Sequence, residues 1–190
     1  MGEKEKSEES QTQERDASAV APSPTAKRPL TQALCQPRSI FDWLALGVAW
    51  WGPSGLSPIA PGTVGSLFTL PLVWVLYHQS FMTYWLSTLG ITAVGFLVSQ
   101  RAAEILQDKD PSSVVIDEVA GVLIACGFLL QLEPLWILPA WVLFRVLDIT
   151  KWGWIDRVQY WKPPALGIMA DDILAGLIAG VVTLSAASLS

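Results

Sequence analysis

Long apolar runs with charged residues concentrated near one of their ends constrain this chain more than any other feature. The sequence contains five such runs: Val64–Tyr77, Phe81–Val98, Val119–Leu132, Leu135–Leu147 and Ile173–Leu189. With 52% hydrophobic and 15% charged residues, the chain is more apolar and poorer in charge than an average soluble domain. Runs of this size occur in membrane-spanning helices and in the buried helices of a soluble bundle, so we expect an all-α fold.

The distribution of charge favours a membrane bundle over a soluble one. If the five runs cross a bilayer and the first leaves the cytoplasm, the loop His78–Ser80 and the turn Gln131–Pro134 lie outside with the C-terminus. All 12 lysines and arginines then lie inside, and Glu133 is the only charged side chain outside. This is a positive-inside distribution. A soluble bundle has no reason to strip one end of its helices of charge, so we expect a multi-pass helical membrane bundle.

Helix length separates the five runs into two kinds. A full span needs about 20 apolar residues, and Phe81–Val98 and Ile173–Leu189 come close to that length. The two runs on either side of Glu133-Pro134 are shorter, and the proline predicts a helical hairpin there. Because runs of that size also occur in buried helices, length alone leaves a soluble bundle open.

The N-terminal part of the chain differs from the rest. Residues 1–38 form a polar tail, and we expect it to be disordered because it has too little apolar surface to offset its ordering entropy. Residues 39–190 form the helical domain. Its first apolar segment, Ile40–Trp51, is too short to span and predicts an interfacial or re-entrant helix. The formal net charge of −5 argues against nucleic acid as a partner.

Acidic pairs precede two of the apolar runs. Asp117-Glu118 opens one, Asp171-Asp172 opens another, and Asp148 follows a third. Acids near helix N-termini often serve only as caps, which would suffice for a single pair. Two pairs on one face, joined by Asp148, instead indicate a metal site. Oxygen ligands without Cys or His suit Mg²⁺ or Mn²⁺.

Small residues follow both acidic pairs and predict close helix packing. They are offset by about one helical turn, so backbones can approach each other closely and bring the two pairs together. The residues concerned are Ala120, Gly121, Ala125, Ala175, Gly176, Ala179 and Gly180.

Two further segments offer groups that bind phosphate. Lys151 lies beside the acids and is able to hold a phosphate as a point charge, whereas Arg145 is explained by an ion-pair row and cytoplasmic anchoring. The loop Ser57–Ser66 precedes an apolar run, and its glycines let the backbone approach an anion. It lacks the Gly-Lys-Ser/Thr ending of a P-loop, and a lone Gly/Pro turn is more often structural.

Several phosphatase chemistries are excluded by composition. The single histidine, His78, lies in a loop at the opposite end from the acids. Phosphohistidine chemistry and a Ser-His-Asp triad are therefore excluded at the acidic site. Neither Cys35 nor Cys126 is followed by the arginine of a phosphate-binding cysteine loop, and we expect no disulfide between them.

Four blocks of sequence resemble the signature blocks of the phosphatidylglycerophosphatase A family, in the family's order across residues 57–176. The resemblance implies an all-α protein of the bacterial inner (cytoplasmic) membrane with its active site on the cytoplasmic face. It implies a Mg²⁺-dependent reaction that removes the terminal phosphate of the phospholipid phosphatidylglycerophosphate to give phosphatidylglycerol. The blocks are SPIAPGTVGS (Ser57–Ser66), KDPSSVVIDEVAG (Lys109–Gly121), FRVLDITK (Phe144–Lys151) and GIMADDILAG (Gly167–Gly176).

The resemblance also implies roles for individual residues. The acidic site would be formed by Asp117, Glu118, Asp148, Asp171 and Asp172, with Mg²⁺ on Asp117, Glu118, Asp171 and Asp172. One acid would act as base on an attacking water, with an aspartyl-phosphate intermediate as the alternative. The phosphate would be held by Lys151, Gly62, Thr63, Gly65 and Ser66. One block departs from the family, since Trp152-Gly153-Trp154 replaces the usual Pro-rich turn.

Two other functions remain compatible with the residues. A small divalent-cation or proton transporter would use the same acids to line a path, although no carboxylate lies near the middle of an apolar run. A catalytically inactive structural relative is the second alternative. Cation flux in vesicles without lipid turnover would identify the transporter.

Overall fold

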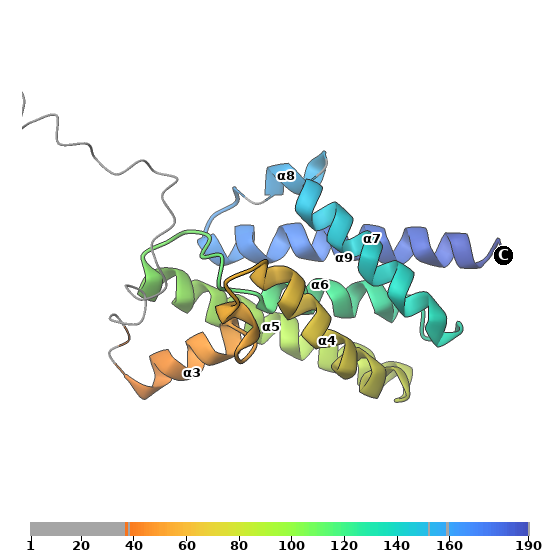
Figure 1. Cartoon of the computed structure of the whole chain (residues 1–190), viewed down its shortest axis with the longest axis horizontal. Helices are drawn as coiled ribbons and strands as arrows, with labels where there is room; N and C mark the ends of the chain where they lie inside the picture. The colour runs from red at the N-terminus through yellow and green to blue at the C-terminus, as the bar shows by residue number, and fades with distance from the viewer. Residues whose placement is uncertain (1–36, 38, 152, 159, 190) are drawn as a thin grey trace, which may run out of the picture. The chain divides into compact units, whose positions relative to one another are not determined.

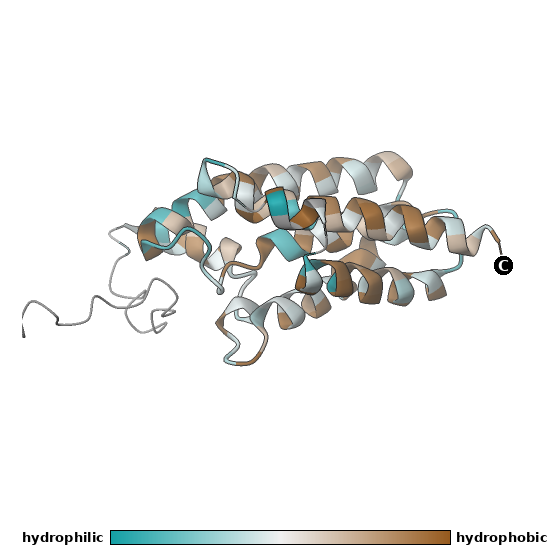
Figure 2. Ribbon diagram, turned by 90° about the horizontal axis from the view of Figure 1, so that it is seen from above, coloured by the Kyte–Doolittle hydropathy of each residue, from teal (hydrophilic) through white to brown (hydrophobic). Residues whose placement is uncertain are grey.

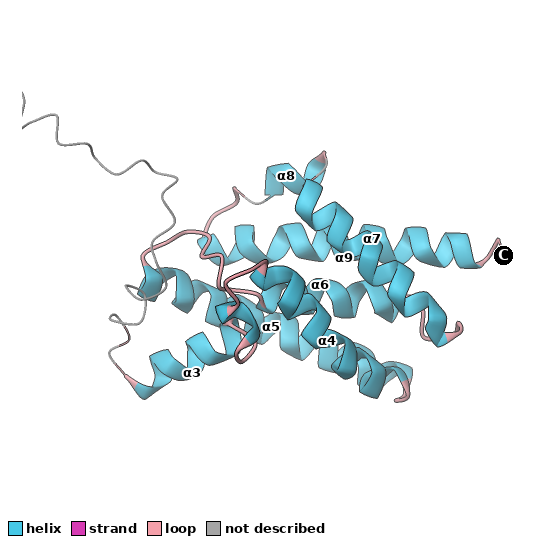
Figure 3. Cartoon of the chain, viewed as in Figure 1, coloured by secondary structure: helices cyan, strands magenta, loops and turns pink. Residues whose placement is uncertain are grey.

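A computed structural model describes residues 37, 39–151, 153–158 and 160–189. Every regular element in this part of the chain is helical (Figure 3), so the predicted all-α fold is confirmed. The predicted disordered tail, residues 1–38, lies outside the described residues except for Pro37. The helices are α3 (Ile40–Ala49), α4 (Pro61–Tyr77), α5 (Phe81–Leu106), α6 (Ile116–Gly127), α7 (Ile137–Thr150), α8 (Trp154–Val158) and α9 (Pro164–Ala187), with 3₁₀ turns at Ser54–Leu56 and Pro134–Trp136.

The predicted helical hairpin is present at Glu133-Pro134. The 3₁₀ turn Pro134–Trp136 separates α6 from α7, with Pro134 at its first position. A proline is favourable there because the N–H that it lacks would have no partner inside the helix. The two short runs are therefore two helices rather than one long one.

The start of α9 differs from the prediction. This helix begins at Pro164, so Asp171-Asp172 lie about two turns inside it and do not open it. The pair Pro163-Pro164 supplies a start signal, since proline is suited to the first helical position. Both acids are buried, and helix capping does not explain them.

Helix α6 is the centre of the bundle and packs against α4, α5, α7 and α9. Glycines bring α6 and α9 into close contact: a Cβ atom on Gly176 would lie 2.4 Å from the carbonyl oxygen of Gly121. One turn further along, a Cβ atom on Gly180 would lie 2.9 Å from the carbonyl oxygen of Ala125. The predicted close approach of these two helices is confirmed, and it sets the distance between the acidic pairs.

The flank of the bundle is apolar. Helices α5 and α9 are long and apolar enough to cross a membrane, and large hydrophobic side chains point outward from α4, α5, α7 and α9. Figure 2 shows hydrophobic residues along most of the length of these helices. A water-soluble monomer rarely exposes so much contiguous apolar surface. A lipid environment around this flank accounts for it, in a protein associated with the membrane.

The two ends of the bundle differ in charge. The α4–α5 turn, the α6–α7 turn and the C-terminal end of α9 lie at one end (Figure 1). The loop between α5 and α6, helix α8 and the start of α9 lie toward the other. Glu133 belongs to the first end, whereas the acidic pairs, Lys109 and Lys162 belong to elements of the second. The charge asymmetry expected from the sequence is therefore present in the fold.

An ion pair between a buried aspartate and a half-exposed arginine attaches α3 to α5. Asp42 caps the start of α3 in a capping box with Ser39, and its Oδ1 accepts a hydrogen bond from Arg101 Nη2 at 2.7 Å. On the outer face, Ile40, Phe41 and Leu44 are exposed. The predicted helix is present, and its place at a membrane interface stays a prediction.

Candidate active site

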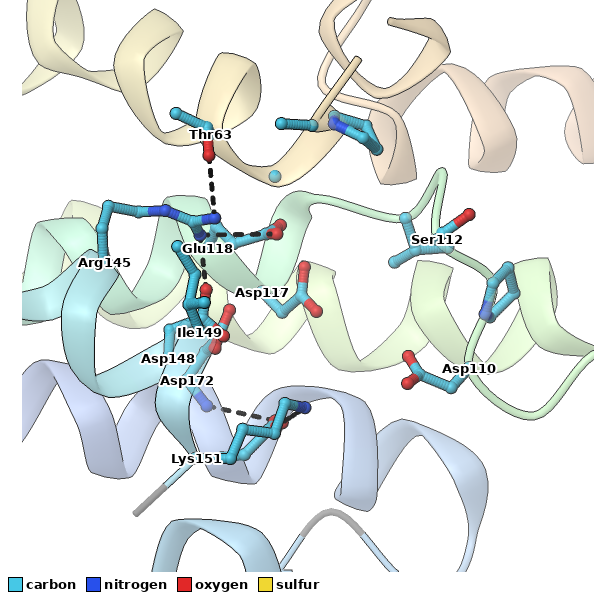
Figure 4. A pocket seen from close by; sticks show the side chains of 16 residues that line it. Thr63, Asp110, Ser112, Asp117, Glu118, Arg145, Asp148, Ile149, Lys151 and Asp172 are labelled. Atoms are coloured by element: carbon cyan, nitrogen blue, oxygen red, sulfur yellow. Dashed lines mark hydrogen bonds and ion pairs between the residues drawn. The ribbon is translucent and has the colours of Figure 1, made fainter. Parts of the chain in front are cut away.

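A cavity of about 260 Å³ lies between the start of α4, the start of α6, the end of α7 and the third turn of α9, and it is lined by all five acids and the lysine predicted from the sequence. Figure 4 shows the side chains pointing into it from these four helices and from the loop before α6. Its polar lining residues are Thr63, Asp110, Ser112, Asp117, Glu118, Arg145, Asp148, Lys151, Asp171 and Asp172.

Three carboxylates form the centre of the cavity. One oxygen from each of Asp117, Glu118 and Asp172 lies within 4.8 Å of the other two. Asp117 Oδ1 and Glu118 Oε2 are buried and have no hydrogen-bond partner among the described residues. A buried, unpaired carboxylate oxygen is costly unless a cation compensates it. This acidic cluster is therefore able to bind a metal, and its all-oxygen donor set fits a hard divalent cation.

The electrostatics of the cluster lead to the same conclusion. Burial, followed by the neighbouring charge of Asp172, raises the pKa of Glu118 to about 8. Burial and the charge of Glu118 raise the pKa of Asp117 well above its usual range. Both shifts arise because negative charge is crowded where water is excluded. A divalent cation supplies the opposite charge that this crowding lacks.

The other two predicted acids are paired with bases. Asp171 Oδ2 accepts a hydrogen bond from Lys151 Nζ at 2.5 Å, and Asp148 accepts one from Arg145. Asp171, one of the four predicted metal ligands, is therefore not part of the three-carboxylate cluster. Burial would lower the pKa of Lys151, but the hydrogen bond and charge of Asp171 outweigh it, and the net shift is upward. Lys151 remains an ammonium ion at the edge of the cavity.

Arg145 is one cavity-lining residue that the sequence analysis did not assign to the site. Its guanidinium donates to Thr63 Oγ1 at 3.2 Å and lies 3.8 Å from Glu118 Oε1. Only 9% of the residue is exposed. An arginine inside an apolar run is expensive unless it is paired. That cost, together with its spacing of three residues from Asp148, is the signal in the sequence that could have assigned Arg145 to the site rather than to an anchoring surface.

The Gly/Pro loop contributes less to the cavity than predicted. Gly62 and Thr63 line it, but Gly65 and Ser66 do not. A Cβ atom on Gly65 would lie 2.8 Å from Val115 Cβ, so this glycine serves the packing of α4 against the segment before α6. The Ser66 hydroxyl donates to the Thr63 carbonyl and accepts from Trp141 Nε1. Two residues that were not predicted, Asp110 and Ser112, line the cavity from the loop before α6.

Gly62 is required by the position of Glu118. A Cβ atom at residue 62 would lie 1.9 Å from Glu118 Oε1, so Gly62→Ala has to displace that carboxylate. We expect the activity of Gly62→Ala to fall by about 100-fold, because a shift of about 1 Å in a site can cost that much. Gly47→Ala is the matched control, since a Cβ atom there meets nothing within 4 Å. Equal activities of the two variants would contradict this role for Gly62.

The chain is similar to known proteins over most of its length. The sequence profile of the phosphatidylglycerophosphatase A family matches residues 47–187. The chain is 35% identical to phosphatidylglycerophosphatase A of Escherichia coli over 144 residues, 74% of this chain and 81% of that one. It is 36% identical to the Haemophilus influenzae protein of the same name, over 68% of this chain and 80% of that one.

A third relative has a different name. The chain is 34% identical to a protein of Bacteroides thetaiotaomicron named putative phosphatidylinositol-3-phosphatase, over 65% of this chain and 81% of that one. No solved structure matches the chain. The family profile spans α4 to α9 with all the cavity-lining residues. The chain therefore belongs to the phosphatidylglycerophosphatase A family.

Proposed function

We propose that this protein is a Mg²⁺-dependent lipid phosphatase that removes the terminal phosphate of phosphatidylglycerophosphate and leaves phosphatidylglycerol. The observation that carries the proposal is a cavity with three clustered carboxylates and two bases at one end of an apolar bundle. A water-soluble phosphate ester does not need an apolar flank beside its site. A phosphorylated lipid headgroup does, since its acyl chains remain in the bilayer.

Asp117, Glu118 and Asp172 would hold the Mg²⁺ ion. Their buried oxygens without partners fit that role, and oxygen ligands are those that Mg²⁺ prefers. When bound, the ion supplies charge stabilisation for the phosphoryl oxygens and lowers the pKa of water. This assignment differs from the sequence expectation in one residue, because Asp171 is held by Lys151.

The bases of the site bind and orient the phosphate. Lys151 lies at the cavity edge and Arg145 spans its wall, so together they present ammonium and guanidinium donors to phosphoryl oxygens. Asp171 and Asp148 hold these two bases in place. Thr63 adds a hydroxyl that already accepts from Arg145.

The reaction requires one proton acceptor. Water adds to phosphorus while the bond from phosphorus to the glycerol oxygen breaks, and that oxygen takes a proton as phosphatidylglycerol leaves. A carboxylate of the cavity accepts the proton of the attacking water. Because the described part of the cavity offers no histidine or cysteine, the acids perform this step.

The charged end of the bundle supports a proposed orientation in the membrane. With the five runs crossing the bilayer, the cavity would open on the cytoplasmic face, as the positive-inside rule requires. Support comes from the two long helices α5 and α9 and from the outward apolar side chains of α4 and α7.

The test is phosphate release by the purified full-length protein in detergent micelles. We expect release from phosphatidylglycerophosphate with Mg²⁺ and none with a chelator. Phosphatidylinositol 3-phosphate belongs in the same assay, because one relative carries that activity in its name. Faster release from phosphatidylinositol 3-phosphate would change the proposed substrate to that lipid. Release that continues in the presence of the chelator would contradict the proposed Mg²⁺ dependence. Folded protein that releases phosphate from neither lipid would overturn the proposal.

A further inference from the structure

A second cavity, of about 570 Å³, adjoins the candidate active site and has no role in the chemistry described above. It is lined by Lys109 and Asp110 from the loop before α6, by Tyr160, Trp161 and Lys162 after α8, and by Pro163-Pro164 at the start of α9. Asp110 lines both cavities, so the two are neighbours.

The lining combines positive charge with apolar surface. Its two lysines outnumber its one aspartate, which leaves the cavity net positive. Within the described part of the chain, neither Lys109 nor Lys162 forms an ion pair. Tyr160 and Trp161 are 73% and 56% exposed, and aromatic side chains of this kind are enriched at membrane–water interfaces.

The charge pattern identifies one occupant. A headgroup with a terminal phosphate and a phosphodiester carries two separated negative groups joined by glycerol. The three-carboxylate cluster and its bases take the terminal group, and the lysine-lined cavity next to it complements the other. We propose that the Lys109/Lys162 cavity binds the phosphodiester of the lipid substrate, with Tyr160 and Trp161 against its glycerol and first acyl carbons. This inference rests on the proposed function.

The subsite would determine selectivity. A lipid whose only phosphate is a monoester fills the acidic cavity but leaves both lysines without a partner. A lipid with the additional phosphodiester gains two attractive contacts on the same protein surface. Discrimination of this kind comes from a difference in affinity between the two lipids.

Binding of the reaction product tests the cavity without turnover. Short-chain phosphatidylglycerol has the phosphodiester but no terminal phosphate, and diacylglycerol of the same chain length has neither. In neutral-detergent micelles, titration calorimetry should show that the full-length protein binds phosphatidylglycerol and not diacylglycerol. Lys109→Gln and Lys162→Gln should each weaken this binding about three- to fivefold, the range of a partly exposed charge pair.

Arg157→Gln is the matched control, because it removes one positive charge from an exposed position in α8 that lines neither cavity. We expect its affinity to change less than twofold. If Arg157→Gln lost as much affinity for phosphatidylglycerol as the lysine variants, the loss would reflect general attraction between the protein and an anionic lipid. That result would overturn the subsite. Equal binding of phosphatidylglycerol and diacylglycerol by the unmodified protein would also overturn it.

The phosphatase assay separates this inference from the function on which it rests. Hydrolysis of phosphatidylglycerophosphate with an unchanged KM in both lysine variants overturns the subsite and leaves the activity standing. Lysine-dependent binding of phosphatidylglycerol without any phosphate release supports the binding cavity and contradicts the proposed reaction. In that case the cavity is an anionic-lipid site and the proposed reaction is wrong. A higher KM with a nearly unchanged kcat in both variants is the result expected if both proposals hold.

Discussion

Asp172→Asn should reduce phosphate release by about 10³-fold or more, the scale of losing a catalytic acid–base or charged group. Asp172 is buried in α9 and its carboxylate is one of the three in the cluster. An amide keeps the shape of the side chain but removes the negative charge that a divalent cation needs. Titration of the protein with Mn²⁺, followed by electron paramagnetic resonance, should show weakened metal binding in parallel with the lost turnover.

Stability separates this effect from misfolding. With a chelator present, Asp172→Asn should unfold at the same temperature as the unmodified protein or higher, because one of several crowded negative charges is gone. Addition of Mg²⁺ should then stabilise the unmodified protein more than the variant, since ligands stabilise the state that binds them. Asp108→Asn, at an exposed position outside the cavity, is the control. If Asp172→Asn retained full Mg²⁺-dependent turnover, Asp172 would have no role in the active site.

Gly176→Ala should both destabilise the bundle and reduce its activity. The added Cβ atom would lie 2.4 Å from the carbonyl oxygen of Gly121, a rigid backbone atom that has no rotamer by which to move aside. Overpacking of this kind costs about 1–3 kcal/mol, and relief requires α9 to move away from α6. Asp172 moves with α9, away from Asp117 and Glu118. We expect kcat to fall by about 100-fold.

The control for Gly176→Ala is Gly90→Ala in the exposed face of α5. A Cβ atom at residue 90 meets nothing within 4 Å, and alanine is favoured over glycine in helices by about 1 kcal/mol. Thermal unfolding in detergent should therefore show no loss of stability for Gly90→Ala, together with full activity. If Gly176→Ala behaves in the same way, the helix contact does not set the geometry of the cluster.

The sequence predicted the helices well because their signals are local. Apolar runs, the proline at Pro134 and small residues at one-turn spacing determine α4 to α7 and the contact between α6 and α9. The predicted start of α9 was wrong. The helix begins at Pro164, but the buried acids after this residue interrupt the apolar pattern from which the start was predicted. Asp171 is tolerated because Lys151 pairs with it, whereas Asp172 joins the carboxylates of α6 in a cluster that is able to bind a metal.

The site was less predictable from sequence than the fold. Which acids share a metal-binding centre depends on side-chain direction, and adjacent residues on a helix point about 100° apart. Asp171 therefore points toward Lys151 and forms an ion pair with it, whereas Asp172 points toward Asp117 and Glu118. Arg145 could not be assigned from spacing alone, because its partner Thr63 is 82 residues away. Gly65 and Ser66 lie one turn beyond the residues of the same motif that face the cavity.

The combination of an apolar flank and a charged cavity at one end has a consequence for how the two products depart. Diacyl product is retained by the bilayer and leaves sideways, in two dimensions, along the outward faces of the helices. Inorganic phosphate leaves toward water through the polar mouth of the cavity. Since the two exits differ, we expect added phosphatidylglycerol and added phosphate to inhibit turnover independently of each other.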